Sequence, residues 1–373
     1  HKFYWSVDVS SYYHQIRVEE DSMQYTAFVL PGGRKFEYTR VPFGIKTAPA
    51  WAQQQLREEL QGNKGTEKLV NFLDDVTFGA NTIEESVEAF RELLKFCIAN
   101  KVKLRRSKCT LGVSAVKALG FVVNEQGKWI DPARVLSLLK IPQARTPKEL
   151  KQLLGSFGFV RQFLCDSAKV CAPLFDLLKK GVKFRWTAAC DQALERLKES
   201  VVLSPCLGQI DSTKTVYARV DASDVGVACV LYQMVREEGA DRELPRAIAY
   251  ASRRFSPAER RWALCEREGY SQKFVWEKFQ SLLQGLPVVI ETDHRNHLYL
   301  HSAQSMKLQR WRMYLQQFPY EIRHVDGNRN CTADGMSRIF EHLSSLHIAN
   351  LMATAPTDEQ ARKERQEGII APS

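Results

Sequence analysis

The chain has 373 residues, of which 44% are hydrophobic and 26% charged, and its net charge is +10. This length gives room for two or more domains with hydrophobic cores, and the composition excludes a disordered chain. The surplus of Lys and Arg favours a polyanionic partner such as nucleic acid, although basic charge alone is a weak indicator.

The cysteines and the start of the chain limit further which class of protein this is. Nine cysteines are scattered without a C-x-x-C pair, which argues against a zinc ribbon and a secreted disulfide framework. This usage is typical of small core residues in a reducing, intracellular compartment. No apolar run reaches membrane-spanning length, so no membrane partner is expected. The chain starts at His1 without Met, inside a strand-like run, which indicates a segment of a longer chain.

Hydrophobic periodicity in the first third predicts an α+β pattern of order β-α-β-β-α-ββ-α-ββ. Strands are expected over 3–9, in a hairpin over 24–41 with a Gly-rich turn, in a hairpin over 68–79, and in a last hairpin from 118 with its turn at 124–127. Helices are expected over 10–16, 50–60 and 83–100.

The middle of the chain, 131–205, has the pattern of a helical module. Its expected helices are 132–139, 147–154, 157–164, 172–178 and 188–203, separated by turns that contain Pro or Gly. The last third predicts an α/β order of βββ-α-β-α-β-α. Its strands are expected at 216–221, 225–232, 246–252, 288–293 and 320–325, and its helices at 257–283, 307–318 and from 332. A polar tail follows from about 343.

Asp74 and Asp75 interrupt an apolar stretch at the turn of the 68–79 hairpin. Two adjacent carboxylates on a tight turn repel each other, and an Asn-Gly or Asp-Gly turn would be more stable. One interpretation is an ordinary solvated turn, which is the commoner case for an isolated pair. The other is a metal site, because Mg²⁺ and Mn²⁺ prefer hard oxygen ligands. Asp8, at the end of the first strand, is either a further ligand or the N-cap of the helix after it.

A second set of carboxylates lies in the last third. Asp221 and Asp293 each end a strand, Glu268 lies on a helix, and Asp334 begins one. Acids that converge from different elements cannot all stay ionised without cations. Two divalent ions could neutralise such a cluster and clamp an in-line phosphoryl displacement, an arrangement known in polymerases and nucleases.

Eight motifs in order resemble the reverse transcriptase–ribonuclease H region of a gypsy-type LTR retrotransposon polyprotein. The resemblance covers about residues 3–340. Four features of the first part carry it: VDVSSYYHQI from Val7, VPFGIKTAP from Val41, FLDD from Phe72, and Lys108-Cys109 followed by Leu119-Gly120-Phe121. The ribonuclease H series is VDAS from Val220, ERE from Glu266, TDH from Thr292 and ADGMSR from Ala333.

The resemblance implies roles for individual residues. Asp8, Asp74 and Asp75 would be the catalytic, metal-binding acids of the polymerase, with two Mg²⁺ or Mn²⁺ ions. Tyr13 would lie under the sugar of the incoming dNTP and exclude a 2′-hydroxyl, unless it is a core aromatic residue like its neighbour Tyr12. The other nucleotide-binding residues would be Phe43 and Gly44, which line the pocket, and Lys108, which either approaches the triphosphate or is a solvated charge.

In the ribonuclease H part, the same resemblance implies that four acids hold two further metal ions. These acids are Asp221, Glu268, Asp293 and Asp334. Glu268 is preferred over Glu266 for its spacing, while Gly269, where the family has an apolar residue, puts local packing in doubt. His324 is expected to be structural.

The implied fold is a right-hand polymerase palm with partial fingers over 1–130, a helical thumb and linker over 131–205, and a ribonuclease H-like α/β domain over 206–342. The implied partners are an RNA template, a DNA primer, RNA–DNA hybrid and dNTPs, with protease and integrase domains flanking the segment in a polyprotein. In the thumb, Lys140, Arg145, Lys148 and Lys151 could contact phosphates. The implied location is cytoplasmic, in a virus-like particle, or nuclear.

Two other functions remain open. A decayed or host-adopted retroelement fragment would bind nucleic acid without catalysis; the intact acids argue against it, and the N-terminal truncation and Gly269 favour it. An RNA-dependent RNA polymerase shares the Asp-Asp hairpin but has no ribonuclease H series after it.

Overall fold

A computed structural model describes residues 1–325 except 63–64, 67–68, 237–241 and 294–304. The chain divides into two compact units, His1–Gln126 and Gly127–Ser373. In the described part of the chain, no helix combines the length and apolar character needed to cross a membrane.

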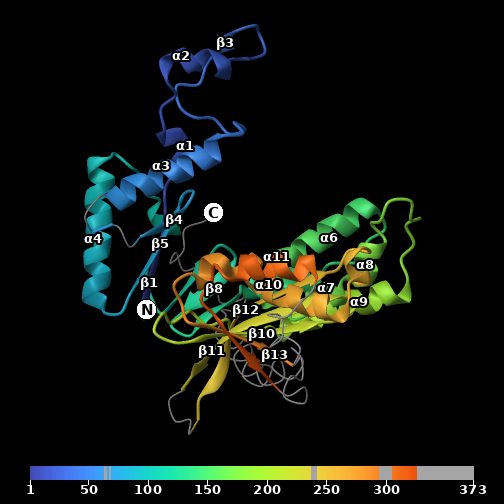
Figure 1. The fold of residues 1–373 in the computed structure, drawn as a ribbon. Helices are drawn as coiled ribbons and strands as arrows, with labels where there is room; N and C mark the ends of the chain where they lie inside the picture. Colours follow the sequence, from blue (N-terminus) through green and yellow to red (C-terminus); the bar gives the residue numbers. More distant parts are fainter. Residues whose placement is uncertain (63–64, 67–68, 237–241, 294–304, 326–373) are drawn as a thin grey trace. The chain divides into compact units, whose positions relative to one another are not determined.

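The first unit is built on an antiparallel sheet of four strands in the order β4-β5-β1-β6 (Figure 1). The strands are β1 (Phe3–Asp8), β4 (Val70–Phe72), β5 (Asp75–Ala80) and β6 (Thr110–Val113). Helices α3 (Ala48–Gly62) and α4 (Ile83–Ala99) share a hydrophobic core with the apolar residues of β1 and β5. Side chains alternate along a strand, so residues between these apolar positions lie on the opposite face of the sheet.

The predicted helices and the 68–79 hairpin of this unit are confirmed, with α3 longer by two residues at each end. Thr82 begins α4 as an N-cap, since its hydroxyl oxygen accepts a hydrogen bond from the Glu85 amide at 3.2 Å. The smaller elements are α1 (Tyr12–Gln15), α2 (Glu20–Met23), η1 (Gln24–Thr26), β2 (Phe28–Val29), β3 (Lys35–Phe36), η2 (Arg106–Lys108), β7 (Ala115–Ala118) and β8 (Phe121–Asn124).

The length predicted for the hairpin over 24–41 is wrong. Only β2 and β3 pair, two residues each, and Gln24–Thr26 forms a 3₁₀ turn instead of a strand. In the described part of the chain, β2 and β3 form a sheet of two strands without a third. An isolated pair of strands is marginal in water, so alternation of apolar residues did not suffice to extend it.

The second unit begins at β9 (Gly127–Ile130) and continues into helices. They are α5 (Pro132–Leu139), α6 (Pro147–Phe159), η3 (Arg161–Phe163), α7 (Ser167–Val170), α8 (Ala172–Asp176) and α9 (Ala188–Val202). The predicted separate helix over 157–164 is wrong, because α6 runs through Gly155 and Gly158 to Phe159. A glycine inside a helix costs only about 0.5–1 kcal/mol, so it does not have to end one.

A five-stranded mixed sheet, in the order β12-β11-β10-β13-β14, follows these helices in sequence. Its elements are β10 (Val216–Ala222), β11 (Gly226–Val235), β12 (Leu244–Arg254), η4 (Glu259–Arg261), α10 (Leu264–Leu283), β13 (Val288–Thr292), α11 (Met306–Leu315) and β14 (Glu321–His324). The predicted strand and helix order is confirmed up to β14, except that α10 starts seven residues later than expected. The helix predicted from 332 lies outside the described residues.

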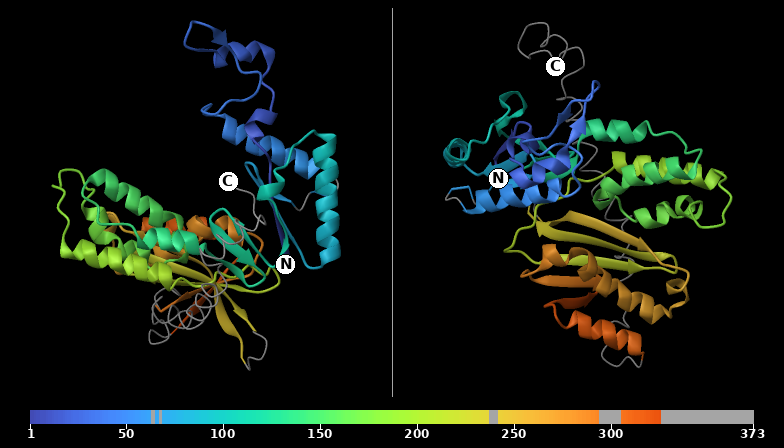
Figure 2. Two further views of the ribbon diagram at one scale, coloured as in Figure 1. Left: turned by 180° about the vertical axis from the view of Figure 1, so that it is seen from behind. Right: turned by 90° about the horizontal axis from the view of Figure 1, so that it is seen from above.

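Helices cover both faces of this sheet (Figure 2). One face packs on α10 in a core that includes Val220, Cys229 and Trp276. On the other face, Ser252 and Arg254 of β12 bind the helical module: the Ala168 amide donates to the Ser252 hydroxyl at 2.9 Å, and Arg254 pairs with Asp176 of α8 at 2.8 Å.

Candidate active sites

Asp8 and Asp75 are directly opposite each other at the ends of two neighbouring strands. They are Cα partners in the antiparallel pairing of β1 with β5. Such pairs place their Cβ atoms about 4.5–5.5 Å apart on one face of the sheet. Because Val7 and Val76 belong to the core, the two acids lie on the face opposite α3 and α4. The sequence predicted a meeting of these acids, and the strand register provides it.

Asp74 lies in the turn that joins β4 to β5. The residue before it, Leu73, has φ of 54°, a left-handed conformation that strains a non-glycine residue. Gln53 of α3 spans this turn: its Nε2 donates to the Asn71 carbonyl at 2.9 Å, and its Oε1 accepts from the Leu73 amide at 2.5 Å. The Asp pair is therefore held in a strained, braced turn, unlike an ordinary solvated one.

The charged groups around Asp75 shift its pKa. Burial raises the pKa of Asp75 above its ordinary value, and the neighbouring charges of Asp74 and Asp8 raise it further, while Lys108 opposes them. The Lys108 ammonium lies 3.5 Å from Asp8 Oδ2. Lys108 thus balances part of the negative charge, and its half-exposed side chain stays accessible to solvent.

Tyr12 and Tyr13 have different environments. Tyr12 is a core residue whose hydroxyl donates to the Ala52 carbonyl at 3.1 Å, and burial raises its pKa to about 12. The Tyr13 ring meets the Phe43 ring edge-on, with 5.8 Å between centroids. Phe43 is 74% exposed, and no atom lies within 4 Å of where a Cβ on Gly44 would be. Tyr13, Phe43 and Gly44 therefore border open space, as a binding surface requires.

The second set of acids also converges. Burial raises the pKa of Asp221, and the charges of Asp293 and Glu268 raise it further. Asp221 is on β10, Glu268 is buried on α10, and Asp293 follows β13, the parallel neighbour of β10. Three of the four predicted acids are thus within electrostatic reach of one another. Asp334 lies outside the described residues.

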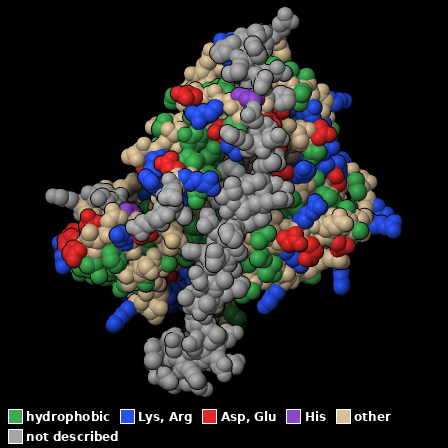
Figure 3. Space-filling view, turned by 90° about the horizontal axis from the view of Figure 1, so that it is seen from below, with side chains coloured by type: hydrophobic (Ala, Val, Ile, Leu, Met, Phe, Trp, Pro, Cys, Tyr) green, Lys and Arg blue, Asp and Glu red, His purple; other side chains and the backbone are tan. Residues whose placement is uncertain are grey.

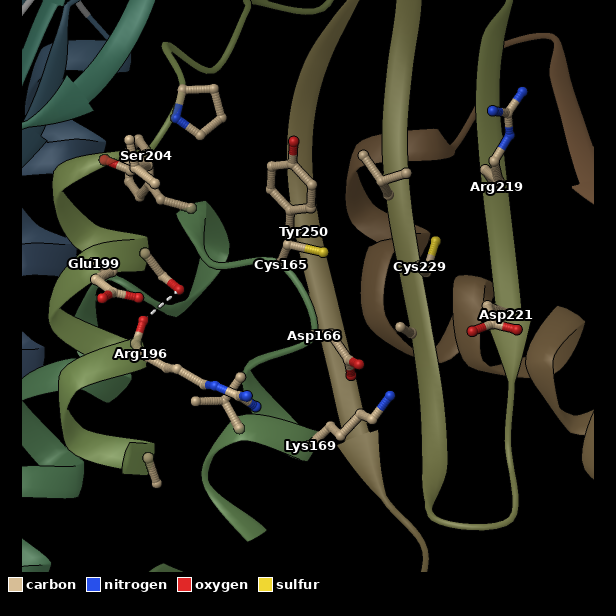
Figure 4. Close-up of a pocket in the computed structure, with 18 of the residues that line it drawn as sticks. Cys165, Asp166, Lys169, Arg196, Glu199, Ser204, Arg219, Asp221, Cys229 and Tyr250 are labelled. Atoms are coloured by element: carbon tan, nitrogen blue, oxygen red, sulfur yellow. Dashed lines mark hydrogen bonds between the residues drawn. The ribbon is translucent and has the colours of Figure 1, made fainter. Parts of the chain in front are cut away.

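A cavity of about 610 Å³ opens beside Asp221, between the helical module and the sheet (Figure 4). Lys169 extends from α7 toward the strand that carries Asp221. Its charge lowers the pKa of Asp221, against the effect of burial. Arg219 and Tyr250 also line the cavity, as does Arg196 of α9.

Two further predictions concern residues near these acids. Glu266 accepts a hydrogen bond from the Ala263 amide at 3.2 Å and pairs with Lys307 at 3.3 Å, so it caps α10. The charge of Glu268, in contrast, raises the pKa of Asp221. His324 Nε2 hydrogen-bonds the Asp293 backbone carbonyl at 2.9 Å, which is a structural contact. Gly269 is buried inside an unbroken α10.

Both sets have the chemistry that a hard divalent cation requires, since all their ligand atoms would be carboxylate oxygens. Among the described residues, however, no three His, Cys, Asp or Glu side chains are gathered closely enough to hold a metal ion. The residues fit a metal by type, and ligation itself is a proposal.

Two protein families match the chain in the order of its two units. Residues 1–123 match the family of reverse transcriptase (RNA-dependent DNA polymerase). Residues 211–318 match the RNase H-like domain found in reverse transcriptase. The chain carries a reverse transcriptase domain and a ribonuclease H-like domain. The first set of acids lies in the reverse transcriptase domain, and Asp221, Glu268 and Asp293 lie in the ribonuclease H-like domain.

The curated relatives are polyproteins. The Transposon Tf2-3 polyprotein of Schizosaccharomyces pombe is 31% identical over 346 residues, and the Tf2-7 polyprotein is 30% identical. The match covers 91% of the chain, which spans 25% of the length of these relatives. The predicted resemblance to a retrotransposon polyprotein of the gypsy type is confirmed.

Solved structures share the fold at low identity. The foamy viral protease-reverse transcriptase dRH in complex with ds DNA has a TM-score of 0.75 at 22% identity, over 87% of this chain and 57% of that one. The foamy viral protease-reverse transcriptase in complex with RNA/DNA hybrid has a TM-score of 0.73 at 22% identity, over 87% and 44%. The predicted fold class, a palm with a ribonuclease H-like α/β domain, is confirmed.

Sequence reasoning missed two residues that touch or face these sites. Gln53 braces the Asp74 turn, and Lys169 faces Asp221 from the helical module. Gln53 is one of three consecutive glutamines, and only its place on α3 distinguishes it. Lys169 is separated from Asp221 by fifty-two residues in sequence, and no local pattern links them.

Proposed function

We propose that the chain catalyses RNA- and DNA-directed DNA synthesis and cleaves the RNA strand of RNA–DNA hybrids. The placement of Asp8 opposite Asp75, beside a strained turn with Asp74, carries the first half of the proposal. Strain of this kind clusters at functional sites. The charge coupling of Asp221 with Asp293 and Glu268 supports the second half.

At the polymerase site, Asp8, Asp74 and Asp75 would hold two Mg²⁺ or Mn²⁺ ions. Such ions, when bound, lower the pKa of the primer 3′-hydroxyl and neutralise the triphosphate of the dNTP. Tyr13, Phe43 and Gly44 would form the surface under the sugar and base. The exposure of Phe43 supports this role, and so does the T-shaped contact of Tyr13 with Phe43.

Lys108 would exchange its partner during the reaction. Its ammonium pairs with Asp8, and its side chain is half-exposed. A triphosphate close to Asp8 would offer the ammonium a stronger anionic partner. Lys108 would then orient phosphate oxygens, and Asp8 would serve as a metal ligand.

At the ribonuclease H site, Asp221, Glu268, Asp293 and Asp334 would hold two further ions. Burial of Glu268 and the raised pKa of Asp221 fit carboxylates that need a cation to stay ionised together. Residues 131–205 would act as the thumb and linker, followed by the ribonuclease H domain to 342 and a polar tail.

The partners would be an RNA template, a DNA primer or RNA–DNA hybrid, and dNTPs. The solved foamy viral enzymes, described in complex with dsDNA and RNA/DNA hybrid, support this. On the face in Figure 3, Lys and Arg side chains are spread among Asp and Glu rather than gathered in one patch. Flanking protease and integrase domains and an intracellular site of action would suit a segment of a polyprotein, which is what the curated relatives are.

Primer extension on an RNA template with Mg²⁺ tests the polymerase, with Asp75→Asn as the matched inactive variant. Release of labelled RNA from a hybrid, with Asp293→Asn beside it, tests the ribonuclease separately. Binding of hybrid without extension or cleavage would overturn the proposal in favour of a non-catalytic retroelement fragment.

A further inference from the structure

A buried ion pair lies directly before the two strand-end acids of the ribonuclease H-like domain. Arg219 of β10 and Glu291 of β13 are Cα partners in the parallel ladder. Arg219 Nε and Nη2 donate to Glu291 Oε2 at 3.0 and 2.7 Å. Their side chains are only 17% and 7% exposed.

Tyr232 of β11 completes a network across three strands. Its hydroxyl donates to the same Glu291 Oε2 at 2.6 Å, and its ring stacks on Tyr217 at 5.2 Å between centroids. A buried ion pair pays a large desolvation cost and is often no more stabilising than apolar residues of the same volume. Fold stability alone is therefore a weak reason for this network.

The position of the network suggests a better reason. Among the described residues, the ladder between β10 and β13 ends at Arg219 and Glu291. Asp221 lies two residues after Arg219 on β10, and Asp293 lies two residues after Glu291, directly past the end of β13. Strand alternation, continued by one residue beyond β13, puts both acids on the face of the pair that precedes them. Figure 4 shows Arg219 and Asp221 along the same strand. The ion pair thus joins β10 and β13 at the last paired position before the two acids.

The backbone around Asp293 is also held on the side of β14. The Val325 amide donates to the Thr292 carbonyl at 2.9 Å, and His324 Nε2 bonds the Asp293 carbonyl at 2.9 Å. β14 therefore holds the backbone of Asp293 from one side. The distance from Asp293 to Asp221 on the other side depends on the tie between β13 and β10.

We propose that the Arg219–Glu291–Tyr232 network positions Asp221 and Asp293 and so sets the affinity of their site for a divalent cation. The proposal rests on the proposed function, in which these acids are metal ligands. Loss of the Glu291 charge would loosen the tie.

Mn²⁺ binding to the full chain tests this proposal. Binding is measured as the loss of the paramagnetic resonance signal of free Mn²⁺. An Asp74→Asn/Asp75→Asn background restricts binding to the ribonuclease H-like site. Glu291→Gln keeps the side-chain volume and should raise the half-saturating Mn²⁺ concentration about 10- to 100-fold, as other positioning partners of metal ligands do. Asp176→Asn is the matched control, because it breaks the Arg254 ion pair of the same sheet without touching β10 or β13.

The expected result is weaker Mn²⁺ binding in Glu291→Gln at a melting temperature similar to that of Asp176→Asn, which should bind Mn²⁺ normally. Equal Mn²⁺ affinity in the two variants would overturn the inference. If Glu291→Gln does not fold, Tyr232→Phe removes one hydrogen bond and keeps the ring; it should shift Mn²⁺ binding in the same direction, and no shift would overturn the inference.

Asp221→Asn separates this inference from the function on which it rests. If Asp221→Asn abolishes Mn²⁺ binding and neither Glu291→Gln nor Tyr232→Phe changes it, only the positioning role fails. If Asp221→Asn leaves Mn²⁺ binding unchanged, the acids are not ligands, and the proposed function of the site fails with the inference.

Discussion

Replacement of Gln53 by Ala should disable the polymerase site without removing any of its acids. The side chain makes two hydrogen bonds to the Asp74 turn, to the Asn71 carbonyl and from the Leu73 amide. At about 0.5–1.5 kcal/mol each, they contribute about 1–3 kcal/mol. A left-handed residue such as Leu73 costs about 1–3 kcal/mol, so the brace and the strain are of the same size.

Two measurements follow from this balance. Hydrogen exchange at the Leu73 amide should accelerate about 5- to 150-fold, the equivalent of 1–3 kcal/mol. Single-nucleotide primer extension should slow by about 100-fold if the acids move by about 1 Å. The assay is extension under saturating dNTP, so that a change in nucleotide affinity does not enter the rate.

Gln54→Ala is the matched control, because Gln54 lies next along α3 and its Nε2 donates to Glu58 on the exposed side, at 2.8 Å. It should exchange and extend like the unmodified chain. Equal extension rates for Gln53→Ala and Gln54→Ala, or unchanged exchange at Leu73, would refute the idea that Gln53 braces the catalytic turn.

Three further substitutions test single residues. Asp221→Asn should raise the melting temperature of the metal-free protein at neutral pH, because the folded pKa of Asp221 is raised and its ionised form therefore destabilises the fold. The gain should shrink as the pH falls through the folded pKa and vanish below the ordinary pKa of an Asp; a gain that grows in acid would contradict this sign. Lys108→Met should leave the melting temperature nearly unchanged, since the Lys108 side of its ion pair with Asp8 is half-exposed, but raise KM for dNTP several-fold; an unchanged KM would make Lys108 a solvated charge. Tyr13→Ala should increase ribonucleotide incorporation about tenfold or more relative to dNTP, and no increase would assign Tyr13 to packing alone.

Much of the fold could be predicted because local patterns agree with the tertiary structure. The amphipathic run of α4 with its Thr82 cap, and the alternation in β10, are each strong enough to be specific. The pattern failed at Gly155, where a glycine was taken as a helix end although α6 continues through it. It also failed over 24–41, where alternation without a third strand gave only two paired residues on each side.

The acids could be predicted because each interrupts an apolar strand or begins a helix in an order that motifs recognise. The residues around these acids could not be predicted. Gln53 bonds the Asp74 turn, Lys169 acts on Asp221 through its charge, and Glu291 pairs with Arg219. Each of these interactions joins elements that are far apart in sequence, so it leaves no local periodicity. Strand register, which sets Asp8 against Asp75, likewise emerges only when the sheet is assembled.

The proposed function requires two independent metal-dependent sites on one chain. A single substrate, an RNA template with a recessed DNA primer and a different label on each strand, tests this requirement with Mg²⁺ present. Asp75→Asn should lose primer extension and keep RNA cleavage, while Asp293→Asn should keep extension and lose cleavage. Loss of both activities in either variant at unchanged melting temperature, or retention of both, would contradict it.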